Sequence, residues 1–169
     1  MIRLGVLGST NGTDLQSILD AIKLKQLKSE LSVVVSNKKK AFILKRAEKY
    51  KIPSYYISHQ NINRETFDRK VTHVLRNHKV DLILLIGFMR ILSKSFCQDW
   101  KGKILNVHPS LLPKYAGGMD TNVHKEVLKN KDKETGCTIH FVTDEIDRGP
   151  VFIQKKCSVD PEDTIKSLK

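Results

Sequence analysis

Residues 81 to 86 read Asp81-Leu82-Ile83-Leu84-Leu85-Ile86, and every position after the aspartate is apolar. A run that is apolar on both of its faces is typical of a parallel strand covered by helices on each side. Toward the N-terminus, short apolar runs alternate with stretches whose apolar residues recur at helical spacing. We expect strands at 2–8, 31–36, 54–57 and 80–88, separated by helices at 15–27, 41–50 and 64–77. This alternation predicts an α/β fold with a doubly wound, mostly parallel sheet.

The residues after this run continue the alternation and then change it. The expected elements are a short helix at 93–100, a strand at 104–108, a loop at 109–121 and a helix at 123–130. The segments 137–143 and 151–159 then resemble an antiparallel strand pair joined by a turn at 144–150. A last helix is predicted to begin at residues 160–162 and has barely started at Lys169, so we expect the natural chain to continue.

The length of 169 residues predicts a single domain over 1–169, truncated at its C-terminus. No apolar run approaches the roughly 20 residues that cross a bilayer, and a strand-like segment follows Met1 directly, so we expect a cytoplasmic protein without membrane contact. The three cysteines lack the short pairs of zinc sites, which predicts free thiols and no metal. The formal charge of +12 would attract phosphates, polyglutamylated cofactors or RNA, without choosing among them.

The turn between the first strand and the first helix, residues 8–14, is a candidate phosphate site. Backbone amides at a helix N-terminus can hold a phosphate. The alternative is an ordinary turn in which Asp14 caps the helix. The glycine spacing differs from G-x-G-x-x-G, and the second strand ends in Ser36-Asn37-Lys38 without an acidic residue. Both observations argue against a dinucleotide ligand.

A second strand end, Gly87-Phe88-Met89-Arg90-Ile91-Leu92, surrounds one arginine with apolar side chains. Ligands of open α/β sheets bind beyond the C-terminal ends of the parallel strands. A flat aromatic ligand would suit this segment. The alternative is a stretch of core whose arginine reaches out to solvent.

A third strand end carries Asn106 and His108, which lie two positions apart and therefore project from the same face of the strand. An amide and a group that titrates near pH 7 are the pair that an acyl transfer needs at its developing oxyanion. The alternative is a structural histidine. A histidine that acts as an acid also needs a carboxylate, and sequence spacing does not select among Asp144, Glu145 and Asp147.

Two stretches together resemble the folate-dependent glycinamide ribonucleotide formyltransferases, and the similarity extends over essentially all 169 residues. They are Asn106-Val107-His108-Pro109-Ser110-Leu111-Leu112-Pro113-Lys114-Tyr115 and Gly136-Cys137-Thr138-Ile139-His140-Phe141-Val142-Thr143-Asp144-Glu145-Ile146-Asp147-Arg148-Gly149-Pro150. The resemblance implies the Rossmann-like fold of the formyltransferase type. It implies catalytic roles for Asn106, His108 and Asp147, and binding of the ribonucleotide phosphate by Gly12, Thr13 and Asp14. The implied folate contacts are Arg64, Met89, Arg90, Ile91, Leu92, Asn106, Thr143, Asp144, Glu145, Ile146 and Asp147.

The phosphate turn departs from the usual G-x-G-S-N form of this family, because Thr10 replaces a glycine and Asp14 replaces an asparagine. A carboxylate near a phosphate repels it unless it turns away to cap the helix. We therefore expect the backbone amides and Thr13 to hold the phosphate more than Asp14 does. The loop 116–124 differs from the shorter P-G-x-H-T-H loop of the family, and no catalytic role is assigned to it.

The resemblance implies transfer of a formyl group from 10-formyltetrahydrofolate to the amine of glycinamide ribonucleotide in purine biosynthesis, without a metal. The amine is expected to attack directly, while Asn106 and a protonated His108, whose pKa Asp147 should raise, stabilise the tetrahedral intermediate. Small molecules are the expected partners, not nucleic acid, and the protein is expected to be a monomer or a homodimer. The alternatives are methionyl-tRNA formyltransferase, which the positive charge favours, formyltetrahydrofolate hydrolase, and a non-enzymatic nucleotide-binding module.

Overall fold

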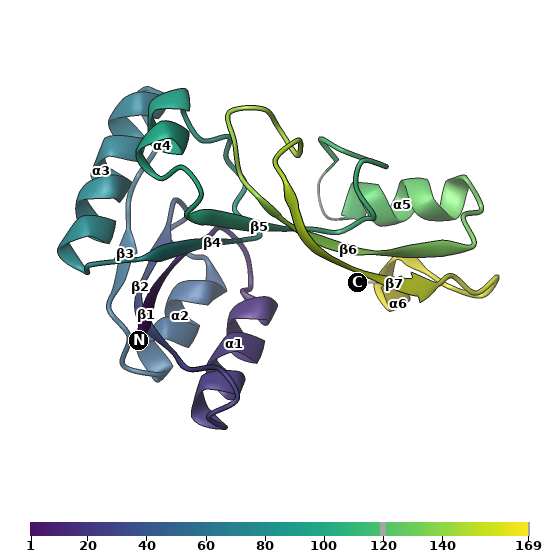
Figure 1. Cartoon of the computed structure of the whole chain (residues 1–169), viewed down its shortest axis with the longest axis horizontal. Coiled ribbons are helices and arrows are strands. Elements are labelled where there is room, and N and C mark those ends of the chain that lie inside the picture. The colour runs from purple at the N-terminus through teal and green to yellow at the C-terminus, as the bar shows by residue number, and fades with distance from the viewer. Residues whose placement is uncertain (119–120, 169) are drawn as a thin grey trace. The chain divides into compact units, whose positions relative to one another are not determined.

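The computed structural model describes residues 1–118 and 121–168, and it forms two compact units (Figure 1). Unit 1 comprises Met1–Leu105, and unit 2 comprises Asn106–Lys169. That residues 1–169 form a single domain stays a prediction. The loop 116–124 includes residues 119 and 120, which lie outside the described part of the chain.

Unit 1 is built on four parallel strands, as predicted, and their order is β3-β2-β1-β4. The strand β1 lies inside this order, and its residues from Leu4 to Gly8 are all buried. The strand β4 begins two residues later than expected, because Val80 still belongs to the end of the preceding helix. The strands are β1 (Ile2–Gly8), β2 (Ser29–Ser36), β3 (Ser54–Tyr56) and β4 (Leu82–Ile86), and the helices are α1 (Thr13–Lys23), α2 (Phe42–Lys49), α3 (Arg64–Asn77) and α4 (Lys94–Asp99).

Helices cover both faces of this sheet. Leu4 and Val6 of β1 share a buried apolar cluster with residues of α1 and α2. A side chain added to Gly5 would instead meet Leu75 of α3 at 2.7 Å and Val80 at 2.9 Å. Successive residues of β1 therefore point to opposite helix layers, as in a doubly wound fold. Figure 1 shows α1 with α2 apart from α3 with α4.

Unit 2 holds the end of β5 (Ile104–His108), whose first two residues belong to unit 1, and an antiparallel strand pair. In this pair β6 (Glu134–Phe141) runs from Glu134 opposite Ser158 to His140 opposite Val151, with an irregularity before His140. The predicted antiparallel pair is confirmed, with β6 starting and ending earlier than expected. The other elements are β7 (Val151–Ser158), α5 (Thr121–Lys129) and α6 (Ile165–Leu168). The predicted helix start at 160–162 is wrong, since these residues lie before α6 in a turn.

Four helices end in the same way, with a lysine in the left-handed region just beyond the helix. In α2, the Lys51 amide donates to the Glu48 carbonyl and the next amide donates to the Ala47 carbonyl, which is the Schellman pattern. Glycine is the usual residue at this position, so a lysine gives no warning of a helix end. The predicted first helix, 15–27, therefore extended beyond the real end of α1 at Lys23. The four residues are Lys25, Lys51, Lys79 and Lys131, with φ between 51° and 58°.

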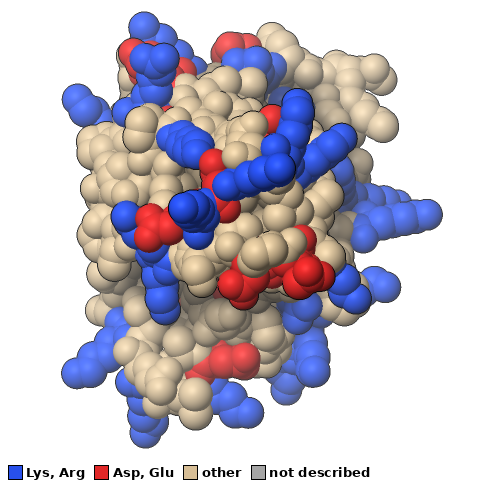
Figure 2. Space-filling model, turned by 90° about the vertical axis from the view of Figure 1, so that its right-hand side faces the viewer, with Lys and Arg blue, Asp and Glu red and all other residues tan. Residues whose placement is uncertain are grey.

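Basic side chains are spread over the face of the molecule drawn in Figure 2, with smaller acidic patches between them. This distribution fits solvated helix surfaces better than one concentrated binding patch. Among the described residues, no helix has the length and the apolar character needed to cross a membrane. Cys137 and Cys157 are free thiols, as expected from their spacing.

Candidate active site

The end of β5 places Asn106 and His108 on one side of the strand. His108 is 2% exposed and Asn106 is half-buried, whereas the intervening Val107 is 39% exposed. Side chains two positions apart on a strand share a face, so the two polar groups project together. This confirms the prediction that Asn106 and His108 lie on the same face of the strand.

Asp147 is the carboxylate that faces His108. Its Oδ2 atom lies 3.2 Å from His108 Nδ1 and accepts a hydrogen bond of 2.8 Å from the Gly117 amide. Asp144 and Glu145, in the same turn, are exposed. The geometry thus identifies Asp147 as the acidic residue that faces His108, a choice that sequence spacing alone had left open.

The turn that carries Asp147 lies close against β6 at Gly149. A Cβ atom on Gly149 would lie 1.8 Å from the Phe141 carbonyl oxygen, so any side chain would push the turn away. The Phe141 amide also donates to the Pro150 carbonyl at 2.9 Å. The Gly149-Pro150 sequence therefore sets where the Asp147 side chain lies relative to the strand.

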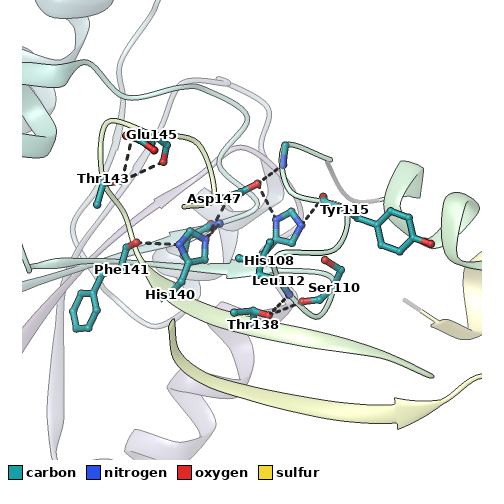
Figure 3. A network of polar contacts seen from close by, with 12 residues as sticks. His108, Ser110, Leu112, Tyr115, Thr138, His140, Phe141, Thr143, Glu145 and Asp147 are labelled. Carbon is teal, nitrogen blue, oxygen red and sulfur yellow. Dashed lines mark hydrogen bonds and ion pairs between the residues drawn. The ribbon is translucent and has the colours of Figure 1, made fainter. Parts of the chain in front are cut away.

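His140 was not among the predicted residues. It lies beside Asp147 (Figure 3) and also contacts Asn106. Its Nε2 atom lies 3.2 Å from Asn106 Nδ2 and 3.5 Å from Asp147 Oδ1, and its Nδ1 atom lies 3.0 Å from the Phe141 carbonyl. A carbonyl can only accept, so Nδ1 carries a proton. Nε2 accepts from the Asn106 amide when the ring is neutral and donates to the Asp147 carboxylate when the ring is charged. We call these four residues the polar cluster: Asn106, His108, His140 and Asp147.

Two polar residues, Thr138 and His140, that alternate with Ile139 along the predicted strand could have indicated His140. Thr138 and His140 are both 2% exposed or less, and they lie two residues apart on β6. Buried polar groups at a spacing of two mean that a strand directs polar side chains into the interior, where each needs a partner. The partners themselves are far away in the sequence, with 34 positions between Asn106 and His140.

The pKa of His108 reflects opposing effects. Burial lowers the pKa below its usual 6.5, the Asp147 charge and the Tyr115 carbonyl act to raise it, and the charge of His140 lowers it further. The net direction is downward. The predicted upward effect of Asp147 is therefore present, but a net rise is wrong, because burial penalises the charged ring more than the carboxylate favours it.

The pKa of Asp147 is lowered. Burial alone would raise it, but a hydrogen bond with His140, the Gly117 amide and the charges of both histidines outweigh burial. The carboxylate is 12% exposed and is ionised at neutral pH. It therefore supplies a fixed negative charge that faces His108.

Thr138 fastens the loop after His108 to β6 (Figure 3). Its hydroxyl donates to the Ser110 carbonyl at 2.7 Å and accepts from the Leu112 amide at 3.0 Å. Gln154 Nε2 donates both to the Thr138 hydroxyl and to the Leu112 carbonyl, each at 2.9 Å. These bonds satisfy the buried polar groups of the loop and restrain the chain next to His108.

In unit 1, the turn after β1 presents backbone amides. Gly12 is the N-cap of α1 with φ 65°, no side chain caps the helix, and a Cβ atom on Gly12 would lie 2.5 Å from Ile43. The first helical bond runs from the Gln16 amide to the Gly12 carbonyl. The amides of residues 13–15 precede this bond and have no partner within the helix. Such donors suit an anion.

Asp14 does not cap α1, so the alternative interpretation of this turn is wrong in that respect. The cap position is occupied by Gly12, and Asp14 is an exposed residue of the first helical turn. Partial loss of hydration raises the pKa of Asp14. Asp14 therefore places an acidic side chain in the first turn of α1, the turn whose amides would meet a phosphate.

Ser9 ties three loops of unit 1 together at the C-terminal ends of their strands. Its hydroxyl donates to Asn37 Oδ1 at 2.6 Å, and it accepts from the Met89 amide at 2.9 Å. The loops after β1, β2 and β4 therefore adjoin each other, which brings the phosphate turn close to the segment 87–92. Sequence reasoning missed Ser9 and Asn37, both less than 5% exposed.

Arg90 is the most constrained side chain of the segment 87–92. Its guanidinium lies 4.4 Å from the centre of the Phe67 ring, and its buried Nε atom has no hydrogen-bond partner. Asp68 nearby accepts from the Ser93 amide at 2.6 Å. Burial raises the pKa of Asp68, against the opposing charges of Arg90 and Arg64. A buried donor without an acceptor fits a ligand that supplies one.

The other predicted folate contacts differ in their exposure. Leu92 is buried at 8%, while Ile91 and Ile146 are about half exposed at 51% and 52%. Thr143 accepts from the Glu145 amide at 3.3 Å. The predicted site residues divide between the units. Unit 1 contains Gly12, Thr13, Asp14, Arg64, Met89, Arg90, Ile91 and Leu92, and unit 2 contains Asn106, His108, Thr143, Asp144, Glu145, Ile146 and Asp147.

A metal centre is not evident in the described part of the chain. Residues 1–118 and 121–168 contain no group of three or more histidine, cysteine or acidic side chains placed to hold an ion. The chemical capacity of unit 2 therefore lies in an amide, two imidazoles and a carboxylate. Together these can donate hydrogen bonds to a developing oxyanion and can carry a proton.

Comparison with known proteins finds similarity to formyl transferases and to purine biosynthetic proteins. The sequence model of the formyl transferase family matches residues 2–169. Phosphoribosylglycinamide formyltransferase of Escherichia coli is 44% identical over 164 residues, which cover 95% of this chain and 76% of that protein. The trifunctional purine biosynthetic protein adenosine-3 of Chironomus tentans is 44% identical over 169 residues. The chain spans 12% of the length of that trifunctional relative.

Solved structures extend the similarity to the fold. The crystal structure of glycinamide ribonucleotide transformylase 1 from Symbiobacterium toebii matches with a TM-score of 0.94 at 35% identity. That match covers 99% of this chain and 78% of the other. The agreement supports the α/β fold class predicted from the alternation of strands and helices.

Proposed function

The chain belongs to the formyl transferase family, and from this premise we propose that it transfers a formyl group from 10-formyltetrahydrofolate to the amine of glycinamide ribonucleotide, in purine biosynthesis. The observation that carries the proposal is the buried pair of His108 and Asp147, connected through His140 to Asn106. The names of the relatives from Escherichia coli and Haemophilus influenzae, both phosphoribosylglycinamide formyltransferases, support the choice of acceptor.

The proposed catalytic residues are Asn106, His108 and Asp147. The neutral amine of the acceptor attacks the formyl carbon and forms the new carbon–nitrogen bond, while the formyl oxygen takes up negative charge. The Asn106 amide has one hydrogen directed at His140, and its other hydrogen is available to that oxygen. His108 contributes the second donor through its Nε2–H, once the formyl oxygen takes the place of the Tyr115 carbonyl, which faces Nε2 at 3.1 Å.

Proton transfer is the proposed second task of His108. Its lowered pKa means that the ring is largely neutral at pH 7 before the reaction. Negative charge on the formyl oxygen would favour the imidazolium, as Asp147 already does. His108 can then give a proton to the folate nitrogen as the old carbon–nitrogen bond breaks, and the attacking nitrogen supplies a proton in return. The protein is unchanged at the end of the cycle.

The substrates are proposed to bind through unit 1 as well as unit 2. The phosphate of the ribonucleotide would meet the amides of residues 13–15 and the Thr13 hydroxyl, while Asp14 would weaken its binding. In unit 1, Arg64 and residues 89–92, where the buried Arg90 Nε–H needs an acceptor, are the proposed folate contacts. In unit 2, the proposed folate contacts are the residues of the turn 143–147. The proposed reaction needs no metal. The cytoplasmic location and the monomeric or homodimeric state stay predictions.

The test is an absorbance assay that follows release of the deformylated folate, or of a stable dideaza analogue, from its formyl donor in the presence of glycinamide ribonucleotide. Release that depends on the ribonucleotide is the expected result. Release without an acceptor would indicate a hydrolase instead. Release only with charged initiator tRNA would assign the chain to the tRNA enzymes. Either of the last two results would overturn the proposed function.

A further inference from the structure

A second polar network lies beside the polar cluster in unit 2, and the proposed mechanism does not use it. The Asp132 carboxylate accepts from Lys114 Nζ at 2.6 Å and from the Tyr115 hydroxyl at 2.7 Å. Asn130 Nδ2 donates to the Tyr115 hydroxyl at 2.8 Å. The Asp132 side chain is 11% exposed. Hydrogen bonds with Lys114 and Tyr115 outweigh the effect of burial and lower the pKa of Asp132, so the carboxylate is charged at neutral pH.

The end of α5 fixes the position of Asp132. The Lys131 amide donates to the Leu128 carbonyl and the Asp132 amide donates to the Val127 carbonyl, as in the Schellman motif. Lys131 takes the left-handed conformation that this motif requires, with φ 51°. Asp132 is therefore held by two backbone hydrogen bonds at the helix end, so its carboxylate is a firm anchor for the residues it binds.

Tyr115 connects this anchor to His108. Its hydroxyl binds Asp132, and its carbonyl lies 3.1 Å from His108 Nε2, while its backbone has φ 61°. The left-handed backbone is costly for a residue with a Cβ atom such as tyrosine, so neighbouring contacts must hold it in place. The Asp132 and Asn130 bonds to the hydroxyl are such contacts.

The Tyr115 carbonyl matters because it accepts from the Nε2–H of the charged His108 ring until a substrate atom takes its place. Nδ1 faces the Asp147 carboxylate and Nε2 faces this carbonyl, and both oxygens can only accept. A neutral imidazole has one N–H, so only the charged ring satisfies both oxygens. Among the described residues, His140 on β6 also acts on the ring, and its charge opposes that of His108.

We propose that Asp132 is a positioning residue: by holding the Tyr115 side chain, it keeps the Tyr115 carbonyl on His108 Nε2 and so favours the charged, proton-donating form of the ring. This inference rests on the proposed function, since it assigns a role within the same reaction. Asp132 touches neither His108 nor the substrates in this scheme. It acts through Tyr115, and its effect is expected in the titration of His108 and in turnover, not in substrate affinity.

The first test measures the titration of His108 directly, by nuclear magnetic resonance of its ring nitrogens without substrates. The proteins are the unaltered chain, Tyr115→Phe and Asp132→Ala. Loss of one hydrogen bond to the charged ring is expected to lower the pKa of His108 by roughly half a unit or more. The control is Glu134→Gln, which removes an exposed carboxylate of the same unit from its pair with Lys156 at 3.4 Å and should leave the His108 titration unchanged.

The second test measures formyl transfer over a range of pH. Each variant is expected to lower kcat roughly fivefold at neutral pH, with KM for both substrates changed less than about twofold, because the lost bond serves the charged ring. The high-pH limb of the kcat profile should move to lower pH, and Asp132→Asn, which keeps one acceptor, should show a smaller change than Asp132→Ala.

The outcomes separate this inference from the proposed function. A His108 titration in folded Tyr115→Phe protein that matches the unaltered chain would overturn the positioning role, even if Asp132→Ala failed to fold. Absence of formyl transfer by the unaltered chain would contradict the proposed function, while the ring titration would still decide whether the Asp132 network acts on His108.

Discussion

The turn after β1 and the polar cluster of unit 2 offer two opposite kinds of polar group. The turn presents backbone amides at the start of α1, without a capping side chain. The cluster presents four side chains that already bind one another and are largely withdrawn from solvent. Backbone donors depend on the path of the chain, whereas the cluster depends on the identity of each residue. We expect a site of the first kind to tolerate substitutions such as Thr10 and Asp14 better than a site of the second kind.

The largest expected effect tests this contrast directly. Asn106→Ala or His108→Ala should lower kcat roughly 100- to 1,000-fold, as for loss of an oxyanion donor. Thr13→Ala should leave kcat within about threefold and raise KM for the ribonucleotide, because the amides remain. Steady-state kinetics on folded variants check both. Near-normal rates in either cluster variant would contradict the catalytic assignment.

Replacement of His140 tests how far the residues of the polar cluster depend on one another. His140→Ala should lower kcat roughly 10- to 100-fold, the usual effect of removing one hydrogen bond to a charged group, because Asn106 and Asp147 both lose a partner. The pKa of Asp147 should rise, since the His140 bond is the main effect that lowers it. Kinetics and carboxyl-carbon resonance titration measure the two effects. An unchanged Asp147 titration would argue against this linkage.

The pH dependence of stability provides a weaker test. The pKa of His108 is lower in the folded chain than its usual 6.5, so the unfolded chain binds more protons as the pH falls below that value. The free energy of unfolding should therefore decrease as the pH drops through 6.5 toward the folded pKa, and His108→Asn should remove part of this slope. The lowered pKa of Asp147 acts in a separate window below its usual 3.8. Urea unfolding at several pH values measures both. Equal slopes in the two proteins would contradict the burial of His108.

The smallest expected effect belongs to the turn. Asp14→Asn should lower KM for the ribonucleotide roughly two- to fivefold, because a carboxylate leaves the neighbourhood of the phosphate while the amides stay. Asp20→Asn, at the other end of α1, is the matched control and should change KM little. A higher KM in Asp14→Asn would show that the carboxylate contributes to binding through another part of the substrate.

The sequence predicted those features that depend on local pattern. The helix α3 was expected at 64–77 and occupies those residues, because its apolar spacing is regular and Asn63 caps its first turn through the Thr66 amide. The shared face of Asn106 and His108 was also predicted from a local pattern, the alternation of side chains along β5. The alternation of strands and helices likewise predicted the parallel sheet of unit 1, without its strand order.

The features that the sequence missed depend on contacts between distant residues. His140, Ser9 and Asn37 bind partners that lie 28 to 80 positions away, and no local pattern indicates such pairs. Asp147 was distinguished from Asp144 and Glu145 only by resemblance to a family. The net pKa of His108 was misjudged because the charge of Asp147 is visible in the sequence, whereas the burial of the ring is not.

The lysines that follow α1, α2 and α3 have a practical consequence for studies of the site. Each occupies a left-handed conformation that glycine would adopt at roughly 1 kcal/mol lower cost. The free energy of unfolding of a domain is only about 5–15 kcal/mol, so removing this cost at three positions would raise it considerably. Replacing Lys25, Lys51 and Lys79 with glycine would create a more heat-resistant host chain. In that host, damaging changes to the polar cluster could be studied by their chemistry, without loss of the fold.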